Sequence, residues 1–118
     1  MAAVTRSLSV IVTAMNEAGN LVPTVENVIA AAAPRMADLE VIIVDDGSTD
    51  GTSELADQLA GADSRIRVHH TGRNRGLAFA YKKGIELATK EFTCWVAGNN
   101  IVPLKGLEDL FDLSLIHI

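Results

Sequence analysis

The stretch VIIVDDGSTDGT, residues 41–52, decides the fold that this sequence predicts. Its first four residues are all β-branched and apolar, so they do not alternate between a core face and a solvent face. Such a run predicts a strand covered on both faces, which is typical of the centre of a parallel sheet. The run ends at Asp45 and Asp46, and turn and helix-cap residues follow at 47–51. The segment therefore predicts a buried strand that ends in a charged loop.

The adjacent carboxylates of Asp45 and Asp46 are the first candidate site residues. In an open α/β sheet, ligands bind beyond the carboxyl ends of the strands, near the point where the strand order reverses. Two neighbouring anions repel each other and lose hydration there, so they need hydrogen-bond donors or positive charge nearby. The alternative is that one of them only caps the next helix, although Ser48 and Asp50 already supply cap residues.

Strands alternate with helices along the whole chain. Besides the central run, the sequence predicts strands at 8–13, 66–69 and 92–96 and helices at about 20–33, 50–61, 75–88 and 103–111. Short connections between parallel strands require right-handed crossovers. We therefore expect an α/β fold: an open, mostly parallel, Rossmann-like sheet of about four strands in the order 3-2-1-4, with flanking helices and the short strand 66–69 at an edge.

Apolar residues at helical spacing predict which face each helix buries. The predicted buried positions are Leu21, Val25, Val28 and Ala32 in the first helix, Leu55, Ala56 and Leu59 in the second, and Leu77, Tyr81, Ile85 and Ala88 in the third.

Composition excludes several classes of protein. The 118 residues form one domain at most, with 48% hydrophobic and 4% aromatic residues. A net charge of −5 argues against a general nucleic-acid binder. The single cysteine, Cys94, rules out an internal disulfide and favours a reducing compartment, so we expect the cytoplasm. No apolar run reaches the roughly 18 residues that cross a bilayer.

Polar strand ends predict a site for a flat, hydrogen-bonding ligand such as a nucleobase. In the predicted strand order, residues 13–17 and 97–100 flank one cleft, with the acidic pair beside it. A carboxylate there accepts hydrogen bonds from ring N–H groups, and Thr13 can donate or accept. Arg73 and Arg75 offer positive charge to phosphates, although both can equally be solvated surface residues.

Other suggestive residues have simpler interpretations. His69 and His70 are adjacent on a strand, so they point to opposite faces and do not share a metal. Cys94, Trp95 and Tyr81 are expected to pack in the fold. Neither a G-x-G-x-x-G turn nor a G-x-x-x-x-G-K-[ST] loop follows the first strand, which disfavours dinucleotide and phosphate-loop binding.

Three motifs in order resemble the inverting family 2 glycosyltransferases of the GT-A fold. They are SVIVTAMNE at 9–17, EVIIVDDGSTDGT at 40–52 and RNRG at 73–76, and the resemblance covers nearly all of 8–111. It implies a site for a nucleotide-diphosphate sugar, with Asp46 as the preferred partner of the base. The residues expected to contact the nucleotide sugar are Thr13, Met15, Asn16, Glu17, Asp45, Asp46, Gly47, Ser48, Arg75 and Asn99.

The resemblance also implies a D-x-D element after the fourth strand, with carboxylates that hold a divalent metal on the diphosphate. In this sequence the two aspartate positions fall on Ala97 and Asn99. Because Mg²⁺ and Mn²⁺ prefer anionic oxygen ligands, Asn99 is a weak candidate ligand. Either the diphosphate holds the metal, or cations such as Arg75 replace it, or the protein binds without turnover. Met15 also stands where the family often has an aromatic residue.

The resemblance implies an incomplete enzyme. Residues 1–112 are expected to be the nucleotide-sugar-binding part, while the catalytic base and the acceptor site lie in later sequence. The acceptor is expected to be polyprenyl phosphate or a similar molecule, with membrane contact only through that later sequence. The alternatives are a catalytically inactive nucleotide-sugar-binding module and, less favoured, a nucleotidyltransferase. The last six residues, LSLIHI at 113–118, resemble a translated sequencing-library adapter and are expected to be a non-native tail.

Overall fold

The computed structural model describes residues 6–116, with the backbone alone at 113–116. Within this range, one parallel sheet contains four strands in the order β3-β2-β1-β4. The predicted open α/β sheet and its order are therefore confirmed. The strands are β1 (Ser7–Ala14), β2 (Asp38–Asp45), β3 (Ile66–His70) and β4 (Phe92–Ala97).

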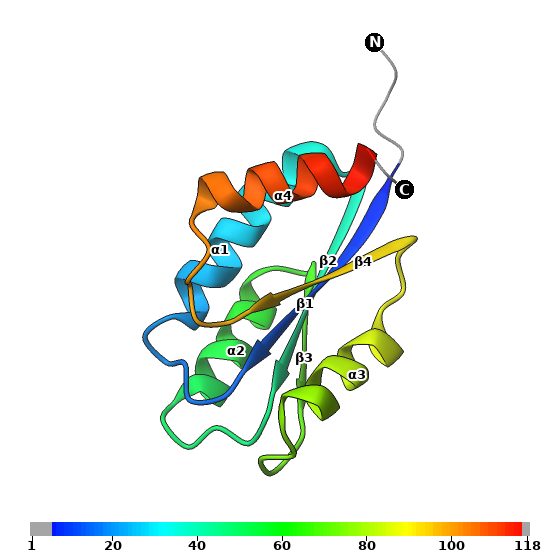
Figure 1. Ribbon diagram of the computed structural model, residues 1–118. Coiled ribbons are helices and arrows are strands. Elements are labelled where there is room, and N and C mark those ends of the chain that lie inside the picture. The colour runs from blue at the N-terminus through cyan, green and yellow to red at the C-terminus, as the bar shows by residue number, and fades with distance from the viewer. Residues whose placement is uncertain (1–5, 117–118) are drawn as a thin grey trace.

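Helices cover both faces of this sheet (Figure 1). On one side lie α1 (Leu21–Ala32), α2 (Thr52–Ala62) and α4 (Leu104–Ile116), and on the other lies α3 (Leu77–Leu87). A short 3-10 helix, η1 (Ala33–Arg35), follows α1 at Pro34. Over residues 6–116, no helix combines the length and apolar character that a membrane span requires.

Side chains of the central strands alternate between two cores. Val41 and Ile43 join the larger core beneath α1, α2 and α4, whereas Ile42 and Val44 join the smaller core that includes Ala80 of α3. All four β2 residues are 0% exposed. Helices on both faces therefore explain the unbroken apolar run.

Helix α3 buries a different face from the predicted one. Small residues, Ala80 and Gly84, form its buried contact with the sheet. A Cβ atom built on Gly84 would lie 2.4 Å from Cγ2 of Ile11, so the helix lies too close to β1 for large side chains. The prediction for α3 was therefore wrong at Leu77, Tyr81 and Ile85. These residues are 56%, 40% and 45% exposed, respectively.

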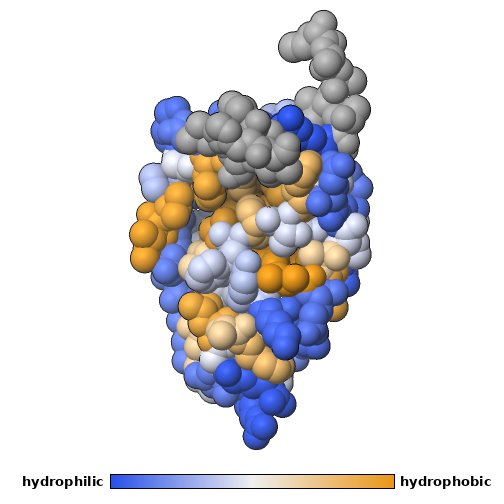
Figure 2. Space-filling model, turned by 45° about the vertical axis from the view of Figure 1, so that its right-hand side comes forward, coloured by the Kyte–Doolittle hydropathy of each residue, from blue (hydrophilic) through white to orange (hydrophobic). Residues whose placement is uncertain are grey.

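Exposed apolar side chains gather where α3 faces β4. The rings of Tyr81 and Trp95 lie 5.5 Å apart between centroids, and each residue remains about two-fifths exposed. Figure 2, which brings this side of the molecule forward, shows hydrophobic areas separated by weakly polar ones. This face is therefore partly apolar.

Several element boundaries differ from the prediction. Helix α2 continues through Gly61, and α3 begins at Leu77 instead of near Arg75. Helix α4 runs to Ile116, beyond the predicted end at Phe111. Of the predicted non-native tail, residues 117–118 and the side chains of 113–116 lie outside the described part of the chain.

Candidate functional site

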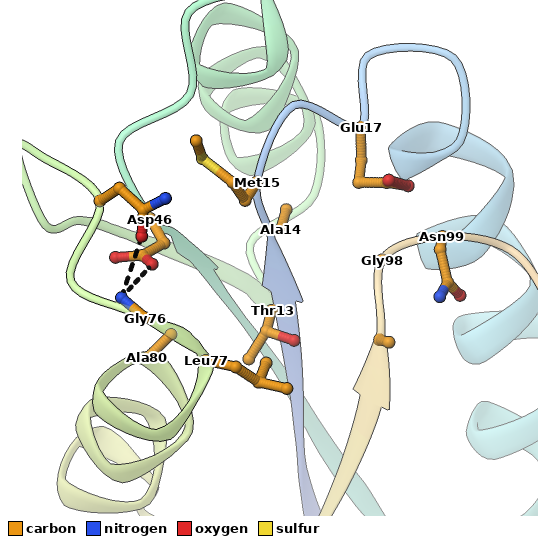
Figure 3. Close-up of a pocket in the computed structure, with 12 residues that line it drawn as sticks. Thr13, Ala14, Met15, Glu17, Asp46, Gly76, Leu77, Ala80, Gly98 and Asn99 are labelled. Carbon is orange, nitrogen blue, oxygen red and sulfur yellow. Dashed lines mark hydrogen bonds between the residues drawn. The ribbon is translucent and has the colours of Figure 1, made fainter.

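A hollow of about 420 Å³ opens at the carboxyl ends of β1, β2 and β4, where the strand order reverses. Its volume falls within the range of small-ligand pockets. The strand ends therefore converge as the sequence predicts (Figure 3). The lining residues are Thr13, Ala14, Met15, Glu17, Asp46, Asn74, Gly76, Leu77, Ala80, Ala97, Gly98 and Asn99.

Asp46 is held at this hollow by the segment that precedes α3. Its Oδ1 accepts hydrogen bonds from the Thr71 hydroxyl at 3.0 Å and the Arg75 amide at 2.9 Å. Its Oδ2 accepts one from the Gly76 amide at 2.9 Å (Figure 3). The Asp46 amide also donates to the Ala14 carbonyl at 2.9 Å. Asp46, which is only 4% exposed, is thus fixed between β1 and α3.

Gly47 permits this contact between loops. A Cβ atom at this position would lie 2.4 Å from the Arg73 carbonyl carbon and 2.4 Å from the Asn74 amide nitrogen. Its φ of +78° also lies in the left-handed region, which disfavours other residues. Glycine at this position therefore lets the loop after β3 approach the end of β2.

Asp45 points away from the hollow that Asp46 lines. It accepts hydrogen bonds from the Ser53 hydroxyl, the Ser48 amide at 3.2 Å and Nδ1 of His70 at 2.8 Å. Burial alone would raise the pKa of Asp45, but these hydrogen bonds outweigh it and hold the pKa below its ordinary value. Asp45 lines a second hollow, of about 380 Å³, together with Gly47 and Ser48. The acidic pair is therefore divided between two hollows.

His70 joins this second hollow to α2. Its Nε2 lies 2.8 Å from Oδ1 of Asp57, so the imidazole bridges two carboxylates. The hydrogen bond with Asp45 outweighs partial burial and, with help from Asp57, raises the pKa of His70. His70 therefore connects β2, β3 and α2 through polar contacts.

The loops after β1 and β2 are joined by hydrogen bonds. The Asn16 side chain accepts from the Thr49 amide at 2.7 Å, and the Asn16 amide donates to the Ser48 hydroxyl at 3.0 Å. The Glu17 amide donates to the Thr52 hydroxyl at 2.9 Å. Asn16 has a φ of +54° and lines neither hollow. These contacts fix the positions of Met15 and Glu17 at the main hollow.

Arg75 presents its backbone to the site. Its amide contacts Asp46, but its guanidinium lies 5.1 Å from the centre of the Phe79 ring and does not line the main hollow. Thr13 does line it, and its hydroxyl accepts a hydrogen bond from the Trp95 indole at 2.9 Å. The hydroxyl proton of Thr13 thus remains to be donated.

Four lining residues lie outside both the predicted site residues and the predicted flanking ranges 13–17 and 97–100: Asn74, Gly76, Leu77 and Ala80. The RNRG segment contains Asn74, but the interpretation centred on its arginines. Leu77 and Ala80 depend on how α3 meets the sheet, for which apolar spacing gave the wrong face.

The residues near β4 do not fit a divalent metal held by protein carboxylates. Ala97 offers no ligand atom, and the Asn99 side-chain oxygen already accepts from the Ile101 amide at 3.2 Å. The part of the chain that the structure describes holds no cluster of three or more histidine, cysteine or acidic residues arranged for a metal. Glu17 supplies a single carboxylate at this end, and it already accepts a hydrogen bond from Asn20.

Comparison with known proteins identifies the family. The family model described as "Glycosyl transferase family 2" matches residues 9–113. The chain belongs to this family. Similar proteins include the glycosyltransferase GlyG of Streptococcus pneumoniae, 35% identical over 88% of this chain and 34% of GlyG. The polyprenol monophosphomannose synthase of Mycolicibacterium smegmatis is 40% identical over 70% of this chain and 30% of that protein.

Solved structures share the fold of this chain. The mannosyltransferase PcManGT from Pyrobaculum calidifontis, in complex with GDP-Man and Mn²⁺, is similar with a TM-score of 0.71 and 28% identity, covering 80% of this chain and 28% of PcManGT. S. aureus TarS 1-349, in complex with UDP-GlcNAc, shares the fold, with a TM-score of 0.75 and 22% identity over 94% of this chain and 32% of TarS 1-349. The chain thus spans about a third of the length of these similar proteins.

Proposed function

We propose that this chain is the nucleotide-sugar-binding part of an inverting glycosyltransferase that transfers a sugar from a nucleotide-diphosphate sugar. The observation that carries the proposal is the hollow at the reversal of strand order, where Asp46 and Thr13 present an acceptor and a donor in a family 2 chain. The GDP-Man complex of PcManGT supports a nucleotide-sugar donor. Similarity to polyprenol monophosphomannose synthase supports polyprenyl phosphate as the acceptor.

The proposed site divides the expected residues into two groups. Thr13, Met15, Glu17 and Asp46 surround the base and ribose, and the diphosphate extends toward Asn99. The second group acts indirectly, by holding the loops in place through the hydrogen bonds described above: Asn16, Asp45, Gly47, Ser48 and the backbone of Arg75. The two groups predict different consequences of mutation, since loss of the second group changes stability together with binding.

The proposed reaction is a single displacement at the sugar carbon, with a nucleoside diphosphate as the leaving group. In this proposal residues 1–112 bind and orient the donor, and a base outside them deprotonates the acceptor. The residues of the site do not fit a protein-held metal, so we expect donor binding without one. A polyprenyl phosphate acceptor would place the complete enzyme at the cytoplasmic face of a membrane. Residues 113–118 have no role in this proposal.

The identity of two residues favours a second candidate function. Ala97 and Asn99 leave the loop after β4 without a carboxylate, so little negative charge would attract a metal there. A catalytically inactive module that binds nucleotide sugars would need no such ligands. The donor site is the same in both candidates, and they differ only in turnover.

Titration calorimetry with UDP-sugars and GDP-sugars, with and without Mn²⁺, tests the donor site. We expect binding that Mn²⁺ changes little and that Asp46→Ala weakens by about tenfold or more, because a buried acceptor is lost. Asp57→Ala is the matched control, since it removes a carboxylate at the second hollow. If Asp57→Ala abolishes binding and Asp46→Ala leaves it unchanged, the nucleotide sugar binds at the second hollow and not at the main one.

Turnover separates the two candidate functions. Release of nucleoside diphosphate should be measured on the longer protein, supplied with nucleotide sugar and polyprenyl phosphate. Donor binding accompanied by release supports the transferase. Donor binding without release supports the inactive module. A folded sample that binds no nucleotide sugar contradicts both.

A further inference from the structure

Trp95 on β4 contacts a residue of the main hollow, although it does not line the hollow itself. Its indole N–H donates a hydrogen bond to the Thr13 hydroxyl at 2.9 Å. In the pairing of β1 with β4, Trp95 lies opposite Ile11, which shares a face of the sheet with Thr13. Figure 3 shows the Thr13 oxygen on the side of β1 that faces β4. The large indole therefore reaches Thr13 diagonally across the two strands.

Tyr81 holds the same indole from the side of α3. The rings of Tyr81 and Trp95 lie 5.5 Å apart between centroids and are tilted by 54°, an arrangement that aromatic pairs prefer. Both residues are about two-fifths exposed, so burial alone does not fix the indole. Its position is set instead by the ring of Tyr81 on one side and by the hydrogen bond to Thr13 on the other.

This hydrogen bond determines what the Thr13 hydroxyl can still do. A hydroxyl group carries one hydrogen to donate and can also accept. Because the indole N–H is a donor only, the Thr13 oxygen must accept from it, and the hydroxyl hydrogen points elsewhere. Among the residues that the structure describes, this hydrogen has no protein acceptor, and Thr13 is only 6% exposed. The direction left for donation is into the hollow that Thr13 lines.

We infer that Trp95 is a positioning residue for the nucleotide, an inference that rests on the proposed function. Its indole orients the Thr13 hydroxyl so that the hydrogen is donated to an oxygen of the bound nucleotide. Without the indole N–H, the hydroxyl rotates freely and pairs with water, which the ligand must then displace. A group that is already oriented lowers the cost of binding. Trp95 therefore contributes to affinity without touching the ligand.

A purely structural role for Trp95 makes a different prediction. If the indole only packs β4 against α3, its loss weakens binding whether or not residue 13 has a hydroxyl group. If the indole orients the hydroxyl, its loss has an effect only while that hydroxyl is present. Variants at the two positions, made singly and together, separate these roles, because residues that act through each other are not additive.

Titration calorimetry on the 118-residue chain, with UDP and GDP as probes, measures this coupling. Trp95→Phe removes the N–H and keeps an aromatic ring beside Tyr81, so it should weaken binding of the tighter probe by about three- to tenfold. Thr13→Val removes the hydroxyl and should weaken binding by a similar factor. In the Thr13→Val background, Trp95→Phe should weaken binding by less than about 1.5-fold.

Two further variants serve as controls for binding. Tyr81→Phe is the matched control, since it removes a polar group from the same aromatic pair and keeps the hydrogen bond between Trp95 and Thr13. It should leave affinity within about 1.5-fold of the parent chain. Thr13→Ser keeps a hydroxyl at the site and should restore most of the affinity that Thr13→Val loses. Circular dichroism checks that every variant is folded.

The indole also reports its own hydrogen bond, because Trp95 is the one tryptophan of the sequence. A proton–nitrogen correlation spectrum therefore contains one indole cross-peak. We expect Thr13→Val to move the indole proton resonance upfield, since a hydrogen bond to oxygen deshields the proton. Thr13→Ser and Tyr81→Phe keep the acceptor and should move the resonance much less.

The outcomes separate this inference from the function on which it rests. If Trp95→Phe weakens binding by less than about threefold in the parent chain, or by about 1.5-fold or more in the Thr13→Val background, the inference is overturned and nucleotide binding stands. An indole resonance that Thr13→Val does not move overturns it as well. If neither UDP nor GDP binds the folded chain, the proposed function fails, and the inference fails with it.

Discussion

His70 connects two carboxylates from different elements, and its titration should appear in the stability of the protein. Its pKa is raised from 6.5, so its contribution is complete below pH 6.5 and is lost as the pH rises through the raised value. The pKa of Asp45 is lowered from 3.8, so its contribution is complete above pH 3.8 and is lost as the pH falls through the lowered value. Between pH 3.8 and pH 6.5, Asp45 and His70 both contribute fully to the free energy of unfolding.

Urea unfolding at a series of pH values measures this effect. The free energy of unfolding should fall above pH 6.5 by about 1 kcal/mol or less, because the His70 side chain is 39% exposed and solvent screens the pair. His70→Gln should flatten this part of the curve. His69→Gln is the matched control, because it removes an imidazole on the opposite face of β3 and keeps the contacts of His70 with Asp45 and Asp57. A curve that His70→Gln does not alter would contradict this role.

Glu40 is a buried carboxylate with four hydrogen bonds, near the start of β2 and thus at the end of the sheet opposite the hollow. It accepts from the Ser9 hydroxyl at 2.8 Å, from Arg67 at 2.6 Å, and from both the amide and the hydroxyl of Thr89. Burial alone would raise the pKa of Glu40, but the hydrogen bonds outweigh it and lower the pKa. This network joins β1, β2, β3 and the segment before β4.

Removal of Glu40 should therefore destabilise the fold strongly. We expect Glu40→Ala to lower the free energy of unfolding by about 2–4 kcal/mol, because its partners lose their acceptor. Asp38→Ala, on the same strand, breaks only the exposed pair with Lys90 and should cost about 1 kcal/mol or less. Denaturant unfolding of both variants measures the difference. Equal losses in the two variants would contradict the importance of burial.

At the residue scale, sequence predicted the hollow better than it predicted side-chain directions. Thr13, Asp46 and Asn99 follow strands whose ends must meet, so their proximity could be foreseen. The separation of Asp45 from Asp46 follows the same alternation that separates His69 from His70, so it was predictable from the sequence. The place of Asn74 at the hollow depends on a loop contact between distant segments, which local pattern does not encode.

At the element scale, the close approach of α3 to β1 depends on one glycine. A Cβ atom at Gly84 would lie 2.4 Å from Cγ2 and 3.0 Å from Cγ1 of Ile11, which is 0% exposed. We expect Gly84→Ala to lower the free energy of unfolding by about 1–3 kcal/mol through overpacking. Because α3 also positions Gly76 at the hollow, the variant should weaken nucleotide binding as well.

Gly61→Ala provides the matched control for this prediction. Gly61 is also helical, but a Cβ atom there meets nothing within 4 Å. Alanine favours helix, so this variant should raise the free energy of unfolding by up to about 1 kcal/mol. Thermal and denaturant unfolding of both variants gives the comparison. A stabilising Gly84→Ala would show that α3 can move away from the sheet freely.

The buried faces of the helices were predictable only where the larger residues face the core. In α1 the predicted positions Leu21, Val25, Val28 and Ala32 are all buried. In α3 the spacing of large apolar residues is equally regular, but the helix packs through Ala80 and Gly84. Periodicity identifies a helix, whereas the distance from helix to sheet decides which stripe becomes buried.

At the scale of the whole molecule, the sheet edge at β4 has no charged residue to protect it. Residues 92–104 contain no charge, and among the described strands β4 pairs only with β1. Natural edge strands commonly carry charged side chains that prevent pairing with other chains. We therefore expect the 118-residue chain to self-associate in a concentration-dependent manner.

A lysine on β4 should reduce this association. Thr93 is exposed, so Thr93→Lys adds charge at the edge without entering the core. Gln58→Lys makes the same change of charge on α2 and should leave association unaltered. Sedimentation velocity at several protein concentrations measures the effect. Equal suppression by both variants would assign it to net charge instead of to the edge.

The position of β1 in the sheet also affects how the protein is made. Of the four described strands, β1 is synthesised before the others and pairs with β2, whereas its other partner, β4, is synthesised after the other three, so Ser9 has no β4 partner until Thr93 is made. At about 5–20 residues per second, that delay lasts several seconds. During this time the side of β1 that later pairs with β4 has no partner strand, and β1 is strongly apolar. Chaperones that bind exposed apolar segments can therefore bind β1 before Trp95 is synthesised.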